Sequence, residues 1–253
     1  GIVSVPMTCP SSCPLPAVLL GLAALNDASV DELVTHCQKV ADVMPVVGFY
    51  LQPAVGGRNL PYAFWKQFAE IENVVGIKLA PFNRYKTLDV VRGVADAGAK
   101  DRITLYTGND DHIVGDLLTP FPVQIDGQPD TINIVGGLLG HWSVWTRKAV
   151  ELVEEISALC GQEKIPMKWW TRDAAVTDSN GAFFDAANDY QGVIAGLHEV
   201  LRRQGLLEGI WCLDPDENLG PGQLAEIDRV YRSYPELNDD AFVRENLDRW
   251  LAD

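Results

Sequence analysis

Short apolar runs alternate with amphipathic helical patterns through the first 160 residues of the chain. The runs are continuously apolar instead of alternating with polar residues, which is typical of parallel strands that are covered on both faces. The helical pattern after the first run begins with a capping box, in which Ser29 is followed three residues later by Glu32. We therefore expect strands within residues 16–25, 45–53, 73–81, 102–110 and 131–140, with helices between them.

The expected strands recur at a regular interval. Tyr50, Lys78, Gly108 and Gly136 occupy similar places in successive runs and are 28, 30 and 28 residues apart. An interval of this size fits one βα unit, and such units build either a (β/α)8 barrel or an open doubly wound sheet. No Gly-x-Gly-x-x-Gly follows any of the runs, which disfavours a dinucleotide-binding sheet.

We therefore expect an α/β fold of the (β/α)8 TIM barrel type that is short of strands. Eight strands close such a barrel, whereas this chain offers five, or six if residues 1–7 form one. The shortfall lies at the N-terminal side, so the chain is expected to lack the first βα units of the barrel.

The strand pattern stops beyond residue 160. Helical patterns follow within residues 183–205, 222–234 and 239–252. The predicted domains are therefore a partial TIM barrel, residues 1–160, and a C-terminal helical extension, residues 161–253.

Charge and cysteine usage narrow the class of protein. The formal net charge of −15 argues against nucleic acid as a partner, because phosphate binding needs clustered Lys and Arg. No apolar run is long enough for a membrane span, and no secretory leader is recognisable. The five cysteines do not resemble a disulfide framework, and no second pair follows Cys9 and Cys13 at the spacing of a zinc site. A reduced, cytoplasmic protein is expected.

Lys78 interrupts an apolar run, residues 73–81, in which a charged side chain is costly. In apolar surroundings the charged form of a lysine is disfavoured, so the pKa falls and a neutral amine becomes available. Such an amine forms an iminium with ketones and aldehydes, and the iminium is an electron sink for breaking or making the adjacent carbon–carbon bond. The alternative is a lysine that ion-pairs with a neighbouring strand or extends its head to the barrel rim.

Tyr50 stands near the end of the preceding strand. Neighbouring parallel strands put Tyr50 and Lys78 within possible reach of each other, and a phenol can relay the protons that iminium chemistry requires. The alternative is a core tyrosine whose hydroxyl reaches solvent.

The segment Tyr50-Leu-Gln-Pro53, followed by Gly76-Ile-Lys78, resembles the dihydrodipicolinate synthase and N-acetylneuraminate lyase family. The resemblance covers about residues 16–160 and implies a (β/α)8 barrel with a three-helix C-terminal extension. It implies a lyase of the class I aldolase type that acts on a 2-oxo acid such as pyruvate, or on a sugar-acid adduct. Lys78 would form the Schiff base without any cofactor, Tyr50 would relay protons, and the protein would be a homo-oligomer, a tetramer or a dimer.

The chain departs from the family pattern in three places. The Gly-x-x-Gly-Glu-type loop that holds the substrate carboxylate is missing, and residues 22–26 replace the family's tyrosine pair. Val55 stands where an arginine is common, with Arg58 three positions further on. We therefore expect a divergent, N-terminally incomplete member.

Polar residues and glycines at two further strand ends are candidate substrate-binding groups. Asn109 and Asp110 follow one strand and could contact substrate or, alternatively, cap the next helix. Gly136 and Gly137 end the last strand and suit either a substrate wall or close packing in the barrel. His141, which follows, is expected to be a structural residue.

Two other functions stay open beside the aldolase. A metal-dependent barrel enzyme would use Asp110, Asp111 and His112 as hard ligands. A non-catalytic, small-molecule-binding relative would explain the missing carboxylate loop.

Overall fold

The computed structural model describes residues 17–252, which form two compact units. The sheet unit comprises residues 17–109 and 116–138, and the helical unit comprises residues 110–115 and 139–252. The strand expected at residues 1–7, and Cys9 and Cys13, lie outside the described residues. The domain boundary at residue 160 stays a prediction.

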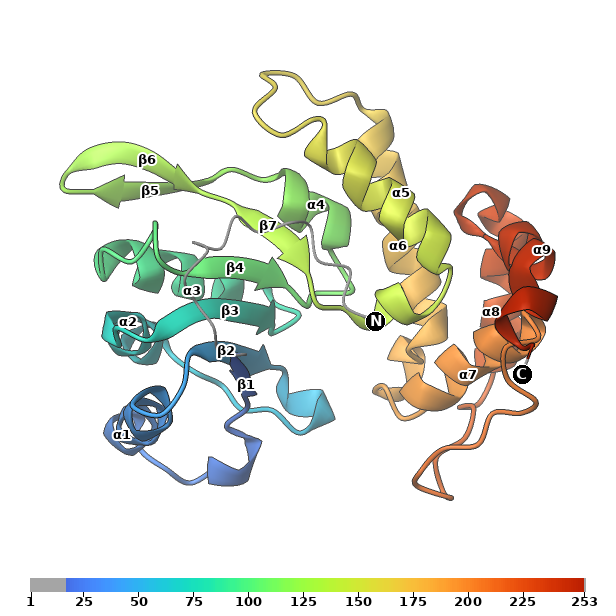
Figure 1. Ribbon diagram of the computed structural model, residues 1–253, viewed down its shortest axis with the longest axis horizontal. Coiled ribbons are helices and arrows are strands. Elements are labelled where there is room, and N and C mark those ends of the chain that lie inside the picture. The colour runs from blue at the N-terminus through green and yellow to red at the C-terminus, as the bar shows by residue number, and fades with distance from the viewer. Residues whose placement is uncertain (1–16, 253) are drawn as a thin grey trace. The chain divides into compact units, whose positions relative to one another are not determined.

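The sheet unit is built on five parallel strands in the order β1-β2-β3-β4-β7 (Figure 1). This sequential order is that of a barrel, whereas doubly wound sheets reverse their order partway. The five predicted strands and the helices after them are all present, with α4 limited to six residues. The bounds are β1 Val18–Leu20, α1 Val30–Ala41, β2 Val46–Leu51, α2 Tyr62–Glu70, β3 Val74–Ala80, α3 Arg84–Asp96, β4 Thr104–Thr107, α4 Ile113–Leu118 and β7 Ile134–Gly137.

Local hydrogen bonds fix the ends of these helices. The predicted capping box of α1 is confirmed: the Ser29 hydroxyl accepts from Glu32 N, and the Glu32 carboxylate accepts from Ser29 N at 2.8 Å. At the C-terminal end of α2, the Arg102 guanidinium donates to the carbonyl oxygens of Ala69 and Val74 at 2.5 and 2.6 Å, and to two carbonyl oxygens between them. These contacts satisfy backbone groups that a helix end leaves unpaired.

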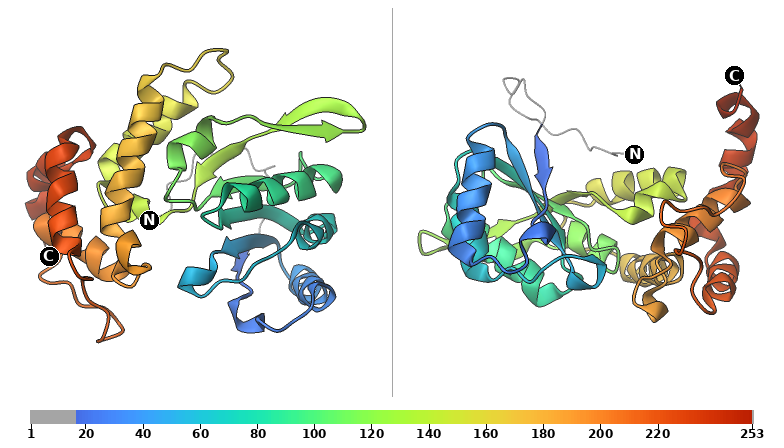
Figure 2. Two further views of the ribbon diagram at one scale, coloured as in Figure 1. Left: turned by 180° about the vertical axis from the view of Figure 1, so that it is seen from behind. Right: turned by 90° about the horizontal axis from the view of Figure 1, so that it is seen from below.

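One face of the sheet packs against helices, as Figure 2 shows for α1 to α3. Tyr50 on β2 lies with its ring centroid 5.1 Å from that of Trp65 on α2. The Cβ that Gly48 lacks would lie 2.7 Å from the Phe68 ring, so the glycine lets α2 approach β2 closely. Because successive side chains of a strand point to opposite faces, residues 48 and 50 mark the helix-packed face and residues 47 and 49 mark the other.

A β-hairpin between α4 and β7 was not predicted. Its strands are β5, Phe121–Ile125, and β6, Gln128–Ile132, and they pair antiparallel. Asp126 and Gly127 at its turn have positive φ values of 51° and 74°. This pattern fits a type I′ turn, for which Asp-Gly is a strong signal, so the sequence did contain evidence for the hairpin.

The helical unit holds α5 and four further helices beyond residue 160 within the described chain, one more than predicted (Figure 1). The helix expected over residues 183–205 is wrong in its first part. Asp185, Asp189 and Tyr190 have left-handed φ values, and the Asp185 carboxylate accepts from Gly192 N, so side-chain bonds replace helical ones there. The bounds are α5 Thr146–Ser157, α6 Lys168–Phe183, α7 Val193–Arg203, α8 Gln223–Ser233 and α9 Asp240–Trp250.

None of the helices within residues 17–252 combines the length and apolar character that crossing a bilayer requires.

Candidate functional site

Lys78 lies in the C-terminal half of β3, on the face of the sheet that α2 does not cover. Its register partners are Phe49 on β2 and Tyr106 on β4, so all three side chains share this face. The Lys78 Nζ atom lies 4.3 Å from the centroid of the Phe49 ring, and the side chain is half-buried. A cation–π contact of this kind stabilises an ammonium by about 0.5–1 kcal/mol. This stabilisation is lost when Lys78 gives up its proton to react as a neutral amine.

Gly108 provides the space that the lysine side chain occupies. A Cβ at Gly108 would lie 2.9 Å from Lys78 Cε and 2.8 Å from Ala80 Cβ, both closer than real Cβ contacts. A glycine is therefore required at the end of β4 for the Lys78 side chain to adopt the conformation seen in the structure. The periodic spacing drew attention to Gly108 but did not identify this role.

The structure does not bring Tyr50 to Lys78. The register shifts by one residue between Val46 and Val47, so Lys78 pairs with Phe49 and Tyr50 pairs with Leu79. The Tyr50 side chain therefore lies on the helix-packed face, where its ring contacts Trp65. The proximity on which the relay role of Tyr50 was based is absent.

The hydroxyl of Tyr50 is bound to the main chain and does not reach solvent. It donates to the carbonyl oxygen of Leu60 at 3.2 Å and accepts from Leu60 N at 3.3 Å. The side chain is fully buried, and burial raises the pKa of this phenol. Tyr50 is therefore a core tyrosine, as the alternative interpretation expected, but its hydroxyl ties the segment before α2 to β2 instead of reaching solvent.

Asn109 belongs to a buried polar network on the helix-packed side. Its side-chain oxygen accepts from Phe82 N at 3.0 Å, and its side-chain nitrogen donates to Thr87 Oγ1 at 3.3 Å and to Asp116 at 2.9 Å. Asp116 is fully buried and also accepts from Thr107 Oγ1 and from the Arg84 guanidinium. The amide of Asn109 is engaged on both sides, so this geometry does not support substrate contact.

Asp110 is part of the helical unit, where it holds two segments in place. Its carboxylate accepts from His141 N at 2.9 Å, and its carbonyl accepts from the side chain of Asn180 on α6 at 2.7 Å. The side-chain oxygen of Asn109 accepts from Phe82 N, and its side-chain nitrogen donates to Asp116 in the first turn of α4, so Asn109 contacts this turn without capping it through that oxygen. Capping by Asp110 stays a prediction, as does a substrate contact of Asp110.

The metal alternative gains no support from the contacts of Asp111 and His112. The Asp111 carbonyl accepts from Thr177 Oγ1 at 2.9 Å, and His112 Nδ1 lies 3.1 Å from a carboxylate oxygen of Asp173. Within residues 17–252, no group of three or more His, Cys, Asp or Glu side chains could hold a metal ion. Asp110, Asp111 and His112 therefore do not converge as ligands.

Gly136 and Gly137 end β7 on opposite faces of the strand. A Cβ at Gly136 would lie 3.3 Å from two carbons of the Tyr106 ring, so this glycine allows the ring to pack closely against β7. Gly137 pairs with Thr107 and is buried. The packing explanation is sufficient for Gly136, and a substrate wall stays a prediction.

His141 has the structural character expected of it. It is almost fully buried, and its Nδ1 lies 2.6 Å from the side-chain oxygen of Asn180. Burial lowers its pKa to about 4, although the bond to Asn180 acts in the opposite direction. The ring is therefore neutral at pH 7.

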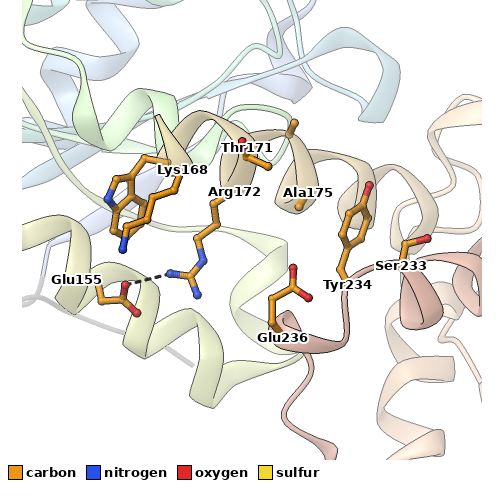
Figure 3. A pocket seen from close by; sticks show the side chains of 10 residues that line it. Glu155, Lys168, Thr171, Arg172, Ala175, Ser233, Tyr234 and Glu236 are labelled. Atoms are coloured by element: carbon orange, nitrogen blue, oxygen red, sulfur yellow. Dashed lines mark hydrogen bonds and ion pairs between the residues drawn. The ribbon is translucent and has the colours of Figure 1, made fainter. Parts of the chain in front are cut away.

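A separate hollow of about 700 Å³ lies within the helical unit, lined by residues of α5, α6 and α8 and the turn after α8 (Figure 3). Arg172 points toward Glu155 across its edge, with 3.1 Å between nitrogen and oxygen. The Tyr234 hydroxyl donates to Asp178 at 2.7 Å. Glu155, Arg172 and Tyr234 are thus already paired with protein partners.

Searches with the sequence found no matching protein-family model and no matching curated protein. Comparison of the structure with solved structures does find matches. The dihydrodipicolinate synthase of Bacteroides thetaiotaomicron aligns with 86% of this chain at a TM-score of 0.63 and 14% identity. The chloride-inhibited dihydrodipicolinate synthase of Acinetobacter baumannii, complexed with pyruvate, aligns with 87% at a TM-score of 0.63 and 17% identity. A Sulfolobus solfataricus 2-keto-3-deoxygluconate aldolase variant aligns with 84% at a TM-score of 0.53 and 16% identity.

The chain spans 66%, 66% and 63% of these three proteins, respectively. They are (β/α)8 barrels, and the sequential parallel strands of the sheet unit with the C-terminal helices correspond to part of that architecture. The resemblance inferred from the segments around Tyr50 and Lys78 is thus confirmed at the level of the fold. The chain is therefore similar in fold to part of the dihydrodipicolinate synthases and the 2-keto-3-deoxygluconate aldolase.

Proposed function

We propose that the chain is a lysine-dependent lyase of the class I aldolase type, in which Lys78 forms a Schiff base with a 2-oxo acid. One observation carries the proposal: no other lysine in residues 17–252 lies in a strand, and Lys78 is half-buried among apolar side chains at the carboxyl half of β3. Sites in parallel βα folds form at this edge of the sheet.

The proposed chemistry follows from the amine. Addition of the neutral amine to the carbonyl carbon and loss of water give an iminium, which draws electrons from the neighbouring carbon–carbon bond. Lys78 would itself supply the electron sink, so the reaction would need no cofactor. Pyruvate is the first substrate to test, because a neighbour in fold was solved with pyruvate and another is named for a 2-keto sugar acid.

Borohydride trapping tests this function directly. The protein is incubated with pyruvate or longer 2-oxo acids, reduced, digested and mapped by mass. We expect a stable adduct on Lys78 that disappears in Lys78→Ala and persists in Lys39→Ala, a control at an exposed helical position. Equal labelling of surface lysines, or no adduct on Lys78, would reject the proposal. Binding of a 2-oxo acid without an adduct would instead favour the non-catalytic, small-molecule-binding alternative.

Two further expectations accompany the proposal. A homo-oligomer, dimer or tetramer, is supported by large exposed apolar side chains on the helical unit, such as Trp211 at 71% exposure, because oligomers cover such surfaces. Sedimentation velocity would measure the state. A cytoplasmic location stays a prediction.

A further inference from the structure

We propose that the phenol of Tyr106, and not that of Tyr50, moves protons at the adduct formed on Lys78; this assignment rests on the proposed Schiff-base function. Tyr106 is the register partner of Lys78 across β3 and β4, and both side chains lie on the face that α2 does not cover. Adjacent strands are about 4.8 Å apart, so the two side chains arise one strand spacing from each other.

Alternation along the strands limits the candidates. On the face of Lys78, the described strands of the parallel sheet carry only two hydroxyl groups, those of Thr104 and Tyr106. Thr104 pairs with Gly76, two residues before Lys78 and about 6.6 Å further from the carboxyl edge at 3.3 Å per residue. Of the two hydroxyl-bearing residues, Tyr106 is therefore the one in register with Lys78, and its side chain is the longer of the two.

The neighbouring strand β7 leaves space for the ring of Tyr106. Its register partner on β7 is Gly136, whose missing Cβ would lie 3.3 Å from the Tyr106 Cδ1 and Cε1 atoms. The ring thus packs against the backbone of β7 while Lys78 contacts Phe49 on β2. Both side chains are half-buried on this face of the sheet.

In the proposed reaction Tyr106 acts first as an acid and then as a base. The Lys78 amine adds to the carbonyl carbon of the 2-oxo acid, and a proton passes from nitrogen to oxygen to give the carbinolamine. Tyr106 then donates its phenolic proton to the carbinolamine hydroxyl, which leaves as water while the carbon–nitrogen double bond forms. The phenolate next removes a proton from C3, and the electron pair of that bond neutralises the iminium as an enamine. Tyr106 ends protonated, as it began.

The test compares Tyr106→Phe with Tyr50→Phe, since each removes one phenolic oxygen. Borohydride trapping at equilibrium reports the adduct on Lys78, and proton NMR in D₂O reports exchange of the pyruvate methyl protons. In Tyr106→Phe we expect the adduct to remain and the exchange rate to fall about 100-fold or more, the scale of one general acid–base group. In Tyr50→Phe we expect exchange within about threefold of wild type.

The outcomes separate this assignment from the proposed function. An adduct together with wild-type exchange in Tyr106→Phe would overturn the role of Tyr106 and leave the Schiff base standing. A wild-type protein without any adduct would overturn both. Should Tyr106→Phe fold poorly, difluorotyrosine at position 106 keeps the hydroxyl; it is expected to shift the pH profile of exchange to lower pH, whereas the same replacement at position 50 is not. An unshifted profile would count against Tyr106.

Discussion

The Cβ that Gly108 lacks would lie 2.9 Å from Cε of Lys78, so the absence of a side chain on β4 determines where the amine on β3 can go. Gly108 follows the last residue of its strand, at the edge where parallel βα folds place their sites. Gly136 stands in the same relation to Tyr106 one strand further along. Gly108 and Gly136 thus leave space for Lys78 and Tyr106, the two side chains on which the proposed chemistry depends.

Gly108→Ala is expected to displace the lysine. The new methyl group would also lie 2.8 Å from Ala80 Cβ, and overpacking of this kind costs about 1–3 kcal/mol. We expect the rate of adduct formation with pyruvate to fall about 10-fold or more in borohydride trapping, while the circular dichroism spectrum stays folded. Gly21→Ala is the control, because no atom lies within 4 Å of the Cβ it would add. Trapping at the wild-type rate in Gly108→Ala would show that the amine does not follow this course.

Tyr50→Phe is expected to lower stability. The hydroxyl holds both main-chain groups of the buried residue Leu60, which would lose their partner. An unmet buried hydrogen bond costs about 1–3 kcal/mol. Urea unfolding should show this loss, and Tyr85→Phe, at a side chain that is 83% exposed, should show almost none. Equal stability of the two variants would contradict the structural role of Tyr50.

Asn109→Asp places a carboxylate beside a buried carboxylate. The Asn109 side-chain nitrogen now donates to Asp116 at 2.9 Å, and an oxygen there would remove the donor and add like charge. We expect about 3–5 kcal/mol lower stability at pH 7 in urea unfolding, on the scale of an uncompensated buried charge. Asn59→Asp is the matched control, since Asn59 is exposed and accepts from the Lys86 ammonium. A stable Asn109→Asp protein would reopen the substrate-contact interpretation.

The order and type of the sheet-unit elements could be predicted from sequence because each element carries its own local signal. Continuous apolar runs indicated the parallel strands, and the Ser29 capping box indicated the start of α1. Helix α6 was missed because its apolar residues show little helical periodicity. The break before α7 depends on the Asp185 side chain binding the main chain of Gly192, which composition alone does not reveal.

The face on which a strand residue lies could not be predicted. A spacing of 28 residues, which pairs Val46 with Val74, would also pair Tyr50 with Lys78. The register shift after Val46 makes the spacing 29, and a one-residue slip transfers a side chain to the opposite face. Such a shift depends on packing between strands, so it has no local sequence signal. The same holds for the distant partners of Asn109 and Asp110, which come from α3, α4 and α6.

His141 is expected to make stability fall as the pH decreases from about 6.5 to about 4. The Asn180 side-chain nitrogen donates to the Asp110 carbonyl, so its oxygen faces His141 and accepts from the neutral ring at Nδ1. Burial lowers the pKa of the folded ring to about 4, whereas an unfolded histidine has a pKa near 6.5. Below pH 6.5 the unfolded chain therefore binds a proton that the folded chain does not, until the folded ring also protonates near pH 4.

The comparison of wild type with His141→Gln isolates this effect from the carboxylates that titrate in the same range. A difference of about 2.5 in pKa corresponds to roughly 3 kcal/mol. Urea unfolding at pH 7 and pH 4.5 should show the wild type losing about 2–3 kcal/mol more than His141→Gln over this interval, although the variant starts less stable at pH 7. Parallel pH profiles of the two proteins would mean that the ring gains its proton in the folded state, which would place it in contact with water and contradict its burial between Asp110 and α6.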